Sequence, residues 1–447
     1  MAEISIIGGG LAGSEAAWQA AELGISVALY EMRPQVSTGA HQTSDLAELI
    51  CSNSLGSSLP EKAAGLLKDE LRRLDSFILS CAEASALPAG GALAVDREKF
   101  SALVTEKISC HPNIRLIREE CLQIPSGPTL IASGPLTSPA LANSIASLTG
   151  QDMLFFYDAI APVVSRDLIN MDIAFRASRY EFAEEADAGD YLNCPLDEMQ
   201  YNHFIRELKN ADRITLGSME GLPTLEKKAG HKLFFQGCLP IEVIADRSDL
   251  SLAFGPMRPV GLRDPRTGKR PAAVVQLRQD NLANTLYNLV GFQTNLTFPE
   301  QKRVFRMIPG LENAEFVRYG QMHRNTFIFS PALLDATLQF RTRPDLFFAG
   351  QIVGVEGYMG NVATGLAAGL NISHWLRGET MLTFPLETMI GSLLNYIANA
   401  SPADFQPMKA VFGILPRLPD PPRERMDRGL AYSKRALKAL DEMIGGI

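Results

Sequence analysis

Four residues near the start of the chain have the types and spacing needed to bind a dinucleotide. Gly8, Gly10 and Gly13 form a G-x-G-x-x-G pattern, and Glu31 follows 18 residues after the third glycine. In this pattern the first glycine permits a tight turn, the second lets backbone approach a pyrophosphate, and the third lets a helix pack on a strand. A carboxylate at that distance accepts hydrogen bonds from a ribose hydroxyl. The residues expected to bind the cofactor here are Gly8, Gly9, Gly10, Leu11, Ala12, Gly13 and Glu31.

Two cysteines have surroundings that are unusual for their type. Cys51 begins a polar run in ELICSNSLGSS (48–58), and Cys238 stands between a glycine and a Leu-Pro pair in FFQGCLPIEV (234–243). Cysteine usually lies among apolar side chains and behaves there as a small hydrophobe. Each thiol therefore either belongs to the core or faces a site where its thiolate acts as a nucleophile or base. The residues alone leave both interpretations open.

The other cysteines show no pattern beyond that of core or surface residues. No pair forms a CxxC motif, and no Cys/His spacing matches a zinc site, so we expect no metal centre and no redox-active disulfide. Reduced thiols throughout indicate a cytoplasmic protein. The cysteines in question are Cys81, Cys110, Cys121 and Cys194.

The elements around the glycines predict a parallel sheet with a nucleotide at its edge. The chain reads as strand, glycine turn, helix and strand over 4–31, with a further strand in PTLIASGPLTS (128–138). A third segment (345–376) reads as a strand ending at Gly350, a glycine-rich loop, and a helix from about Ala363 that contains Gly365. FAD enzymes of the glutathione-reductase type place such a late helix N-terminus against the flavin. The alternative is a glycine-rich hairpin followed by a core helix.

This late loop and helix make FAD the expected cofactor. No second G-x-G-x-x-G occurs in a comparable context, so a separate NAD domain is not expected. A nicotinamide cofactor would then bind transiently beside the flavin and reduce it directly. The fold class is α/β: a glutathione-reductase-type FAD-binding Rossmann domain with a mixed, mostly β insertion domain. We assign 1–150 and 331–447 to the FAD-binding domain and 151–330 to the insertion.

Several further elements can be predicted from periodicity and capping residues. A polar connection (33–60) contains a short helix-like piece, and 61–84 reads as one amphipathic helix. Asp96 is placed to cap the next helix, and two helices are expected near the end of the chain. From about 155 to 330, short Pro-bounded apolar runs predict strands.

Composition limits the class of protein. The chain has 447 residues, 46% of them hydrophobic, and a net charge of −8, which argues against a protein that coats nucleic acid. No apolar run is long enough to cross a bilayer, and the first residues resemble a strand rather than a signal peptide. Two local segments are basic: 255–271 has five Lys/Arg against one acid, and 415–438 has seven against three. Taken singly, each could be a solvated loop or a surface helix.

Several long sequence segments, spread along the chain, resemble those of one family. They are GGGLAGSEAAW, YEMRP, ELICSNSL, FFQGCLPIEV, FGPMRPVGL, QLRQDN, GLENAEFVRYGQMHRNTF and GVEGY. In this order they resemble the bacterial folate- and FAD-dependent tRNA (uracil-5-)-methyltransferases. The resemblance implies methylation of the T-loop uridine (tRNA position 54), with methylenetetrahydrofolate as one-carbon donor and NAD(P)H reducing FAD. The implied partner is the T-arm of tRNA, and neither a membrane nor a metal is implied.

The resemblance also gives the two thiols roles. Uracil C5 becomes nucleophilic when a thiolate adds to C6, and by this resemblance Cys238 adds to C6 while Cys51 assists, for example by removing the C5 proton. Segments 255–271 and 415–438 become the expected phosphate contacts. The uridine must leave its stack to reach a flavin.

The chain departs from the family pattern at two places. Phe298 stands where tryptophan is expected, and Met359, Gly360 and Asn361 replace the residues usual after GVEGY. These changes leave room for a uridine of ribosomal RNA as substrate. The chain could also be a small-molecule FAD oxidoreductase, a wobble-uridine tRNA flavoprotein, which would be longer, or a non-catalytic RNA-binding flavoprotein. The order of the thiol roles, NADH versus NADPH, the folate pocket and the oligomeric state stay open.

Overall fold

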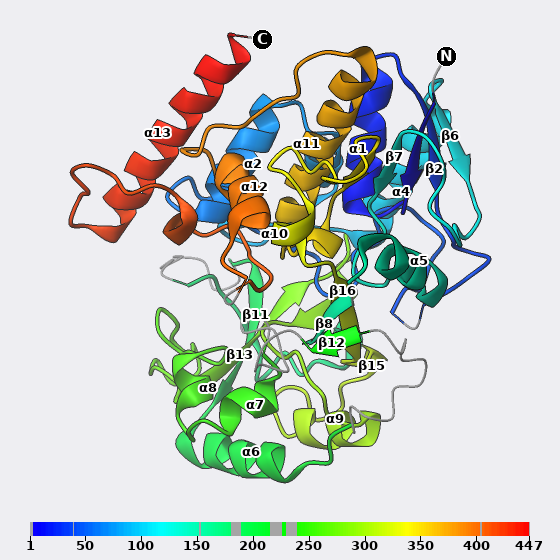
Figure 1. Cartoon of the computed structure of the whole chain (residues 1–447). Helices are drawn as coiled ribbons and strands as arrows, with labels where there is room; N and C mark the ends of the chain where they lie inside the picture. The colour runs from blue at the N-terminus through cyan, green and yellow to red at the C-terminus, as the bar shows by residue number, and fades with distance from the viewer. Residues whose placement is uncertain are drawn as a thin grey trace.

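A five-stranded parallel sheet lies in the upper part of the molecule, toward the right in Figure 1. The computed structural model describes residues 3–38, 40–151, 153–179, 189–214, 226–228, 239–402 and 405–446. Strand order is β17-β7-β1-β2-β6, and every neighbouring pair is parallel. The strands are β1 (Glu3–Ile7), β2 (Ser26–Tyr30), β6 (Ile114–Ile117), β7 (Thr129–Ile131) and β17 (Leu346–Phe348). The predicted α/β class and the strand–turn–helix–strand start are confirmed.

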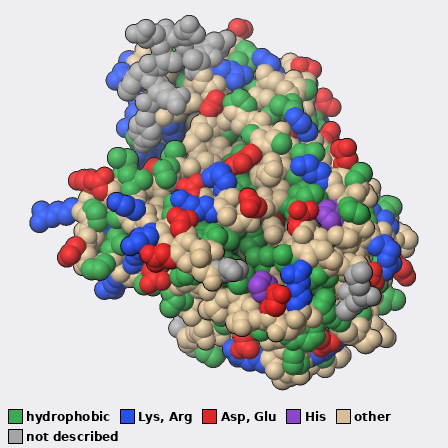
Figure 2. Space-filling view, turned by 90° about the horizontal axis from the view of Figure 1, so that it is seen from above, with side chains coloured by type: hydrophobic (Ala, Val, Ile, Leu, Met, Phe, Trp, Pro, Cys, Tyr) green, Lys and Arg blue, Asp and Glu red, His purple; other side chains and the backbone are tan. Residues whose placement is uncertain are grey.

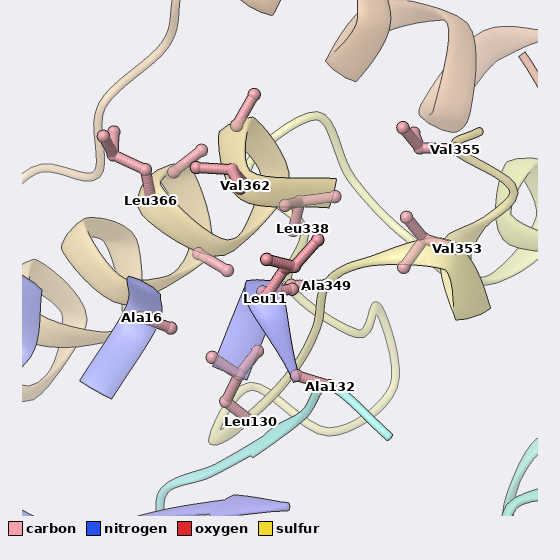
Figure 3. Close-up of a cluster of buried hydrophobic side chains, with 14 of the residues drawn as sticks. Leu11, Ala16, Leu130, Ala132, Leu338, Ala349, Val353, Val355, Val362 and Leu366 are labelled. Carbon is pink, nitrogen blue, oxygen red and sulfur yellow. The ribbon is translucent and has the colours of Figure 1, made fainter. Parts of the chain in front are cut away.

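Two helices far apart in sequence pack directly against each other beside this sheet. They are α1 (Leu11–Glu22) and α11 (Tyr358–Arg377). A side chain at Gly365 would lie 2.3 Å from the carbonyl oxygen of Ala12, and one at Gly369 would lie 2.7 Å from that of Ala16. Figure 3 shows small and branched side chains of both helices meeting between the ribbons. The run of small residues therefore allows close backbone approach, which holds the starts of α1 and α11 near one another.

The other elements of this part lie around the sheet and these helices. A small antiparallel sheet consists of β3 (Ser54–Ser57), β5 (Ala92–Val95) and β4 (Ala86–Leu87). The helices are α2 (Ala63–Arg73), α3 (Phe77–Ala84), α4 (Arg97–Cys110), α5 (Pro139–Thr149), α10 (Ser330–Leu333), α12 (Met389–Asn399) and α13 (Arg425–Ile444). The Asp96 carboxylate accepts the N–H of Lys99, so the predicted cap of α4 is confirmed, as are the two late helices.

The lower part of Figure 1 is built mostly on antiparallel sheets. The larger sheet has the order β10-β11-β13-β14-β9-β15, and the smaller has the order β12-β8-β16. Its strands are β8 (Met153–Ala159), β9 (Val163–Ser165), β10 (Phe175–Arg176), β11 (Tyr191–Leu196), β12 (Glu226–Lys228), β13 (Ala273–Gln279), β14 (Leu286–Leu289), β15 (Phe316–Arg318) and β16 (Met322–Phe327). Its helices are α6 (Glu198–Asn210), α7 (Ile241–Ala245), α8 (Ser251–Phe254) and α9 (Phe298–Phe305). A mostly β insertion is confirmed, and its boundaries at residues 151 and 330 stay a prediction.

The expectation of one helix over 61–84 was wrong. The segment forms α2 and α3, separated by Asp75, which has a φ of 53°. Ser76 caps α3 by accepting the N–H of Leu79, and the buried Glu15 carboxylate accepts the N–H groups of Phe77 and Ile78. These bonds give the second helix a start of its own, which the continuous apolar periodicity does not reveal.

Two further expectations about helices were wrong. The helix-like piece in 33–60 is a turn, because Ala47 has a φ of 53° and donates its N–H to the carbonyl of Gly9. Helix α11 begins at Tyr358 rather than near Ala363, since Gly357 takes a φ of 88° that ends the preceding loop.

Candidate functional site

A cleft with about 1070 Å³ of empty space opens at the carboxyl end of the parallel sheet. Ligands of open α/β sheets bind at this edge. Side chains and backbone from β1, β2, the loop after β7, the loop after β17 and the start of α11 surround it. The predicted residues that line it are Gly8, Gly10, Leu11, Ala12, Glu31, Cys51 and Gly350.

The glycine turn leaves one side open toward this cleft. Gly8 has a φ of 106°, and a side chain there would lie 2.5 Å from the carbonyl oxygen of Ala132. A side chain at Gly13 would lie 1.8 Å from the carbonyl oxygen of Gly8, so Gly13 packs helix α1 on the turn. Gly10, in contrast, has nothing within 4 Å of the same position. The open side is where a phosphate can approach the first N–H groups of α1.

Glu31 lies at the end of β2, buried beside the glycine turn. Its carboxylate accepts the N–H of Gly9 at 3.0 Å and the Nε–H of Arg33 at 2.8 Å. Burial opposes ionisation, but the Arg33 guanidinium and these hydrogen bonds outweigh it, so the pKa of Glu31 lies below its usual value. Arg33 in turn pairs with Glu48 at 2.9 Å. The carboxylate is therefore ionised and held in place as a hydrogen-bond acceptor.

The remaining predicted cofactor residues stand behind the cleft. Gly9 anchors Glu31, whereas Gly13 and Gly365 provide close packing for α1 and α11. Asn361, on the first turns of α11, lines the cleft and is 8% exposed. Its Oδ1 has no hydrogen-bond partner within the described residues, so it can accept a bond from a ligand. The open turn, the ionised Glu31 carboxylate and this acceptor fit a dinucleotide such as FAD.

Cys51 is fixed at the wall of the same cleft. The hydroxyl oxygen of Tyr358 accepts the backbone N–H of Cys51 at 2.9 Å and that of Ser52 at 3.1 Å. The Sγ atom lies 4.0 Å from Oδ2 of Asp158, on β8. The structure thus places the thiol in the cleft that the glycine turn and the start of α11 also line, beside strand β8 of the mixed three-stranded sheet of the insertion.

The polar residues after Cys51 have a different role from the expected one. We expected Ser52 and Asn53 to donate bonds to a thiolate or to uracil. Asn53 is fully buried, and its amide donates to the carbonyls of Val95 and Gln279 and accepts from Arg278 at 2.8 Å. Arg278 also donates to Ser52 Oγ at 2.7 Å. Both side chains therefore fasten the Cys51 loop to β13.

The other cysteines differ in how they are placed. Cys238 lies outside the described residues, so its nearness to Cys51 stays a prediction. Cys121 also lines the cleft, but its Sγ donates to the carbonyl of Gln123 at 3.0 Å, and burial raises its pKa. Burial raises the pKa of Cys81 to about 11 and that of Cys194 to about 12, so both stay thiols. Cys110 is exposed.

Sequence reasoning missed three polar residues near the thiol: Asp158, Glu356 and Tyr358. Asp158 and Glu356 are 5% and 7% exposed. Burial raises the pKa of Asp158 to about 7. Burial, followed by the charge of Asp158, raises the pKa of Glu356 well above its usual value. One available signal was that Asp158 is the only charged residue in the apolar run MLFFYDAIAPVV.

The basic segments both present charges to solvent. In 255–271 all five Lys/Arg side chains are exposed, although Arg266 pairs with Asp264 at 2.7 Å. In 415–438 six of seven are exposed, and α13 buries Gly429, Ser433, Ala436 and Leu440 on its other side. Figure 2 shows that on the face seen from above, basic and acidic side chains are interspersed. Phe298 is 45% exposed and stacks on Tyr319, with ring centroids 4.9 Å apart.

Within the described ranges, no three His, Cys, Asp or Glu side chains gather closely enough to hold a metal ion. No helix among those residues is both long and apolar enough to cross a membrane.

Comparison with known proteins places the chain among relatives of one kind. The profile of the family described as glucose inhibited division protein A matches residues 3–380. The chain is 55% identical to the methylenetetrahydrofolate–tRNA-(uracil-5-)-methyltransferase TrmFO of Natranaerobius thermophilus, over 99% of both chains. It is 52% identical to the protein of the same name from Bacillus pumilus, over 98% of both.

The solved structures support the fold. GidA of Aquifex aeolicus in its form I crystal superposes with a TM-score of 0.67 at 15% identity, covering 99% of this chain and 76% of that one. The form II crystal gives a TM-score of 0.66. At this identity the likeness concerns the arrangement of the elements, and the Rossmann-type sheet with its inserted sheets is shared.

Proposed function

The chain belongs to the glucose inhibited division protein A family, and we propose that it methylates C5 of a uridine in tRNA with methylenetetrahydrofolate as the one-carbon donor. The observation that carries this proposal is the position of Cys51. Its thiol lines the same cleft as the dinucleotide turn, in a chain 51–55% identical over nearly its whole length to methyltransferases of that name. A reactive thiol beside a flavin site is what C5 methylation of uracil requires.

FAD fits the cleft described above and would be held by the glycine turn, Glu31 and the first turns of α11. Bound there, FAD supplies hydride chemistry between a nicotinamide and the one-carbon unit. NAD(P)H as the reductant rests on the resemblance and on the absence of a second dinucleotide motif in the sequence. The N-terminus of α1 stabilises the pyrophosphate charge.

The thiols provide the nucleophile and the base. Sulfur of Cys238 adds to C6 of the uracil, and the electron pair of the C5–C6 double bond moves toward C5 and the O4 carbonyl. After the one-carbon unit is attached, Cys51 removes the C5 proton, the double bond reforms and the C6–S bond breaks. Tyr358 holds the Cys51 backbone, and Arg278 holds the following residues, so the thiol position is fixed from both domains.

The T-loop uridine at position 54 is the proposed target, and segments 255–271 and 415–438 are the proposed phosphate contacts. Their exposed Lys and Arg side chains support this role, because phosphate contacts provide most of the non-specific affinity for nucleic acid. The cytoplasm is the proposed location, because the cysteine pattern of the sequence indicates reduced thiols.

The deciding experiment is nucleoside analysis of an unmodified tRNA transcript. The transcript is incubated with the FAD-loaded protein, NAD(P)H and methylenetetrahydrofolate, digested, and analysed by mass spectrometry, with a parallel sample that lacks folate. Folate-dependent 5-methyluridine, mapped to the T-loop, is the expected product. No product from FAD-loaded protein would overturn the tRNA assignment.

A uridine of ribosomal RNA is the second candidate substrate. It is favoured by the residues after Tyr358, since Asn361 lines the cleft where the family pattern has another residue. A ribosomal RNA transcript run beside the tRNA distinguishes the two.

A further inference from the structure

A buried carboxylate faces the Cys51 thiol from the insertion. Asp158 lies on β8, 107 residues from Cys51, and its Oδ2 is 4.0 Å from Sγ. Its Oδ1 accepts the N–H of Ala159 at 2.8 Å. Within the described part of the chain, no ion pair joins Asp158 to a basic side chain. A buried acid without a cationic partner holds its proton more tightly than an exposed one, so this carboxylate can exchange protons near neutral pH.

A second acid stands behind the first. Glu356 is 7% exposed and its Oε1 accepts the amide N–H of Gln351 at 2.6 Å. Burial and the nearby charge of Asp158 both keep Glu356 protonated after Asp158 has ionised. Two neighbouring buried carboxyls cannot both ionise readily. The pair therefore titrates in sequence, with Asp158, the one beside sulfur, losing its proton first.

Several other charged or titratable groups around this site have partners of their own among the described residues. Arg97 donates to the carbonyls of Leu49 and Ile50 and pairs with Asp280, and Arg278 donates to Ser52 and Asn53. The hydroxyl of Tyr358 accepts two backbone N–H groups, and burial raises its pKa. Among the described residues, the charged or titratable groups that interact with this cluster of side chains include Glu48, Arg97, Arg278, Asp280, Arg318, Glu356, Tyr358 and Lys409.

We propose that Asp158 is the proton acceptor of the Cys51 thiol. The inference rests on the proposed function, and it adds a residue to the machinery at uracil C5. The S–H bond of Cys51 breaks, its electron pair stays on sulfur, and an O–H bond forms at Oδ2 of Asp158. One thiol and one carboxylate become one thiolate and one carboxylic acid, so the site keeps a single negative charge.

The thiolate then accepts the C5 proton. The C5–H electron pair becomes the C5–C6 double bond, and the C6–S bond breaks to leave a thiolate on the other cysteine. Asp158 releases its proton to solvent between turnovers. Internal transfer matters because an ordinary thiol, with a pKa near 8.5, is only a few per cent thiolate at neutral pH.

The pH dependence of Cys51 reactivity tests this proposal without any RNA. The FAD-loaded full chain is treated with iodoacetamide from about pH 5.5 to 10, and Cys51 alkylation is measured by peptide mass spectrometry, with exposed Cys110 as internal reference. In the wild type we expect the alkylation rate of Cys51 to rise in two separate steps as the pH increases. The first, near pH 7, follows ionisation of Asp158; the second lies above the ordinary thiol range, because the Asp158 charge opposes a second ionisation.

Asp158→Asn should leave a single rise, at lower pH than the upper rise of the wild type. At about pH 8.5 Cys51 then alkylates faster, by up to roughly tenfold, since the opposing charge is gone. Release of tritium from tRNA labelled at uridine C5 should nevertheless fall roughly a hundredfold, the lower range for a lost acid–base group. More thiolate together with slower C5–H cleavage is not what loss of packing alone would produce.

Three further variants complete the test. Glu356→Gln mimics an acid that is still protonated when Asp158 ionises, so both rises should remain. Asp158→Glu keeps a carboxylate and should restore both rises and part of the tritium release. Asp249→Asn, at an exposed position of the insertion, should change neither the alkylation profile of Cys51 nor the tritium release.

A single rise in the wild type, or an Asp158→Asn profile identical to it, would overturn the proposal. Should Asp158→Asn fail to fold, the wild type decides through the infrared S–H band of Cys51, identified by its loss in Cys51→Ala. Two rises without any methylated RNA would reject the proposed function but keep the proton pair. Methylated RNA together with a single rise in Cys51 alkylation would keep the proposed function and reject the proton pair.

Discussion

The hydroxyl of Tyr358, the first residue of α11, accepts the backbone N–H of Cys51 at 2.9 Å, although 307 residues separate the two. The same oxygen accepts the N–H of Ser52. The start of the late helix and the thiol loop are thereby held as one unit at the wall of the cleft. The late helix thus sets the position of the Cys51 sulfur as well as part of the shape of the cleft.

Tyr358→Phe should slow methylation with little effect on FAD retention. The change leaves two backbone N–H groups without their acceptor, which costs about 1–3 kcal/mol for a buried group and frees the Cys51 loop to shift. We expect kcat to fall by roughly tenfold or more while the KM for tRNA changes little. Steady-state kinetics with FAD-loaded protein checks this, and Tyr319→Phe, a half-buried position in the insertion outside the lining of the cleft, serves as control. Equal kcat values for Tyr358→Phe and wild type would contradict it.

Gly10→Ala should weaken FAD binding without lowering the thermal stability of the apoprotein. A side chain at Gly10 meets no protein atom within 4 Å, and its φ of −74° suits any residue. The added methyl group would occupy the space where the pyrophosphate approaches the turn. We expect an FAD Kd at least about tenfold higher, corresponding to about 1.4 kcal/mol, with an unchanged Tm for the apoprotein.

Gly413→Ala is the matched control, because its side-chain position is also open but lies away from the cleft lining. Fluorescence titration of apoprotein with FAD measures both variants. Wild-type affinity in Gly10→Ala would place the pyrophosphate elsewhere.

The start of the fold was predictable because its signals are local. The glycine turn, its strands and Glu31 lie within 29 residues, and each has a conformational or packing reason that operates over that distance. Helix α11 was harder, since Gly357, with a φ of 88°, sets its beginning ahead of the small residues that suggested a start near Ala363. The break at Asp75 depends on Glu15, a buried residue 60 positions earlier that caps the second helix.

The site was predictable only in part. The surroundings of Cys51 indicated an unusual thiol, but Asp158 comes close only because β8 of the insertion pairs with β16 and lies against the cofactor cleft. No spacing in the sequence encodes that contact. The same holds for Arg278, which reaches Asn53 and Ser52 across 225 and 226 residues.

Replacing either Cys51 or Cys238 should slow methylation without slowing reduction of the flavin. Cys51→Ala and Cys238→Ala should each lower folate-dependent methylation by at least about 10², because nucleophile and base act in the same sequence of steps. NAD(P)H oxidation with oxygen as acceptor should continue at a near wild-type rate in both, since neither thiol takes part in reducing the cofactor. Cys110→Ala is the control. Loss of flavin reduction together with methylation would instead favour a structural role for the thiols.

Glu70 should make the protein less stable as the pH rises from about 4.5 to about 8. Its carboxyl is fully buried and accepts the N–H groups of Met389 and Ile390, yet burial raises its pKa to about 8. Between these pH values the unfolded chain loses a proton that the folded chain keeps, so stability falls and then levels off. The total effect is of the order of a few kcal/mol.

Urea unfolding of wild type and Glu70→Gln at pH 5.5, 7 and 8.5 measures this effect. The variant cannot ionise, so its stability relative to wild type should improve steadily over the series. Glu106→Gln, at an exposed position of α4, should show no such trend. Parallel curves for Glu70→Gln and wild type would mean that Glu70 is ionised throughout.

Neutralising basic side chains in 255–271 should lower the salt dependence of tRNA binding. Lys269 and Arg270 are both exposed, and no ion pair joins either to an acidic side chain among the described residues. If each binds a phosphate, the K269A/R270A double variant should lower the slope of log K against log salt by roughly two, because each neutralised phosphate adds a little under one to that slope. The slope is measured with unmodified tRNA by fluorescence anisotropy from about 50 to 200 mM salt.

Arg115→Ala is the control. It removes an exposed charge on the edge strand β6, where Arg115 pairs with Glu3, and should leave the slope unchanged. An equal decrease in both variants would point to the overall charge of the protein, whereas a decrease confined to K269A/R270A places the RNA over this loop.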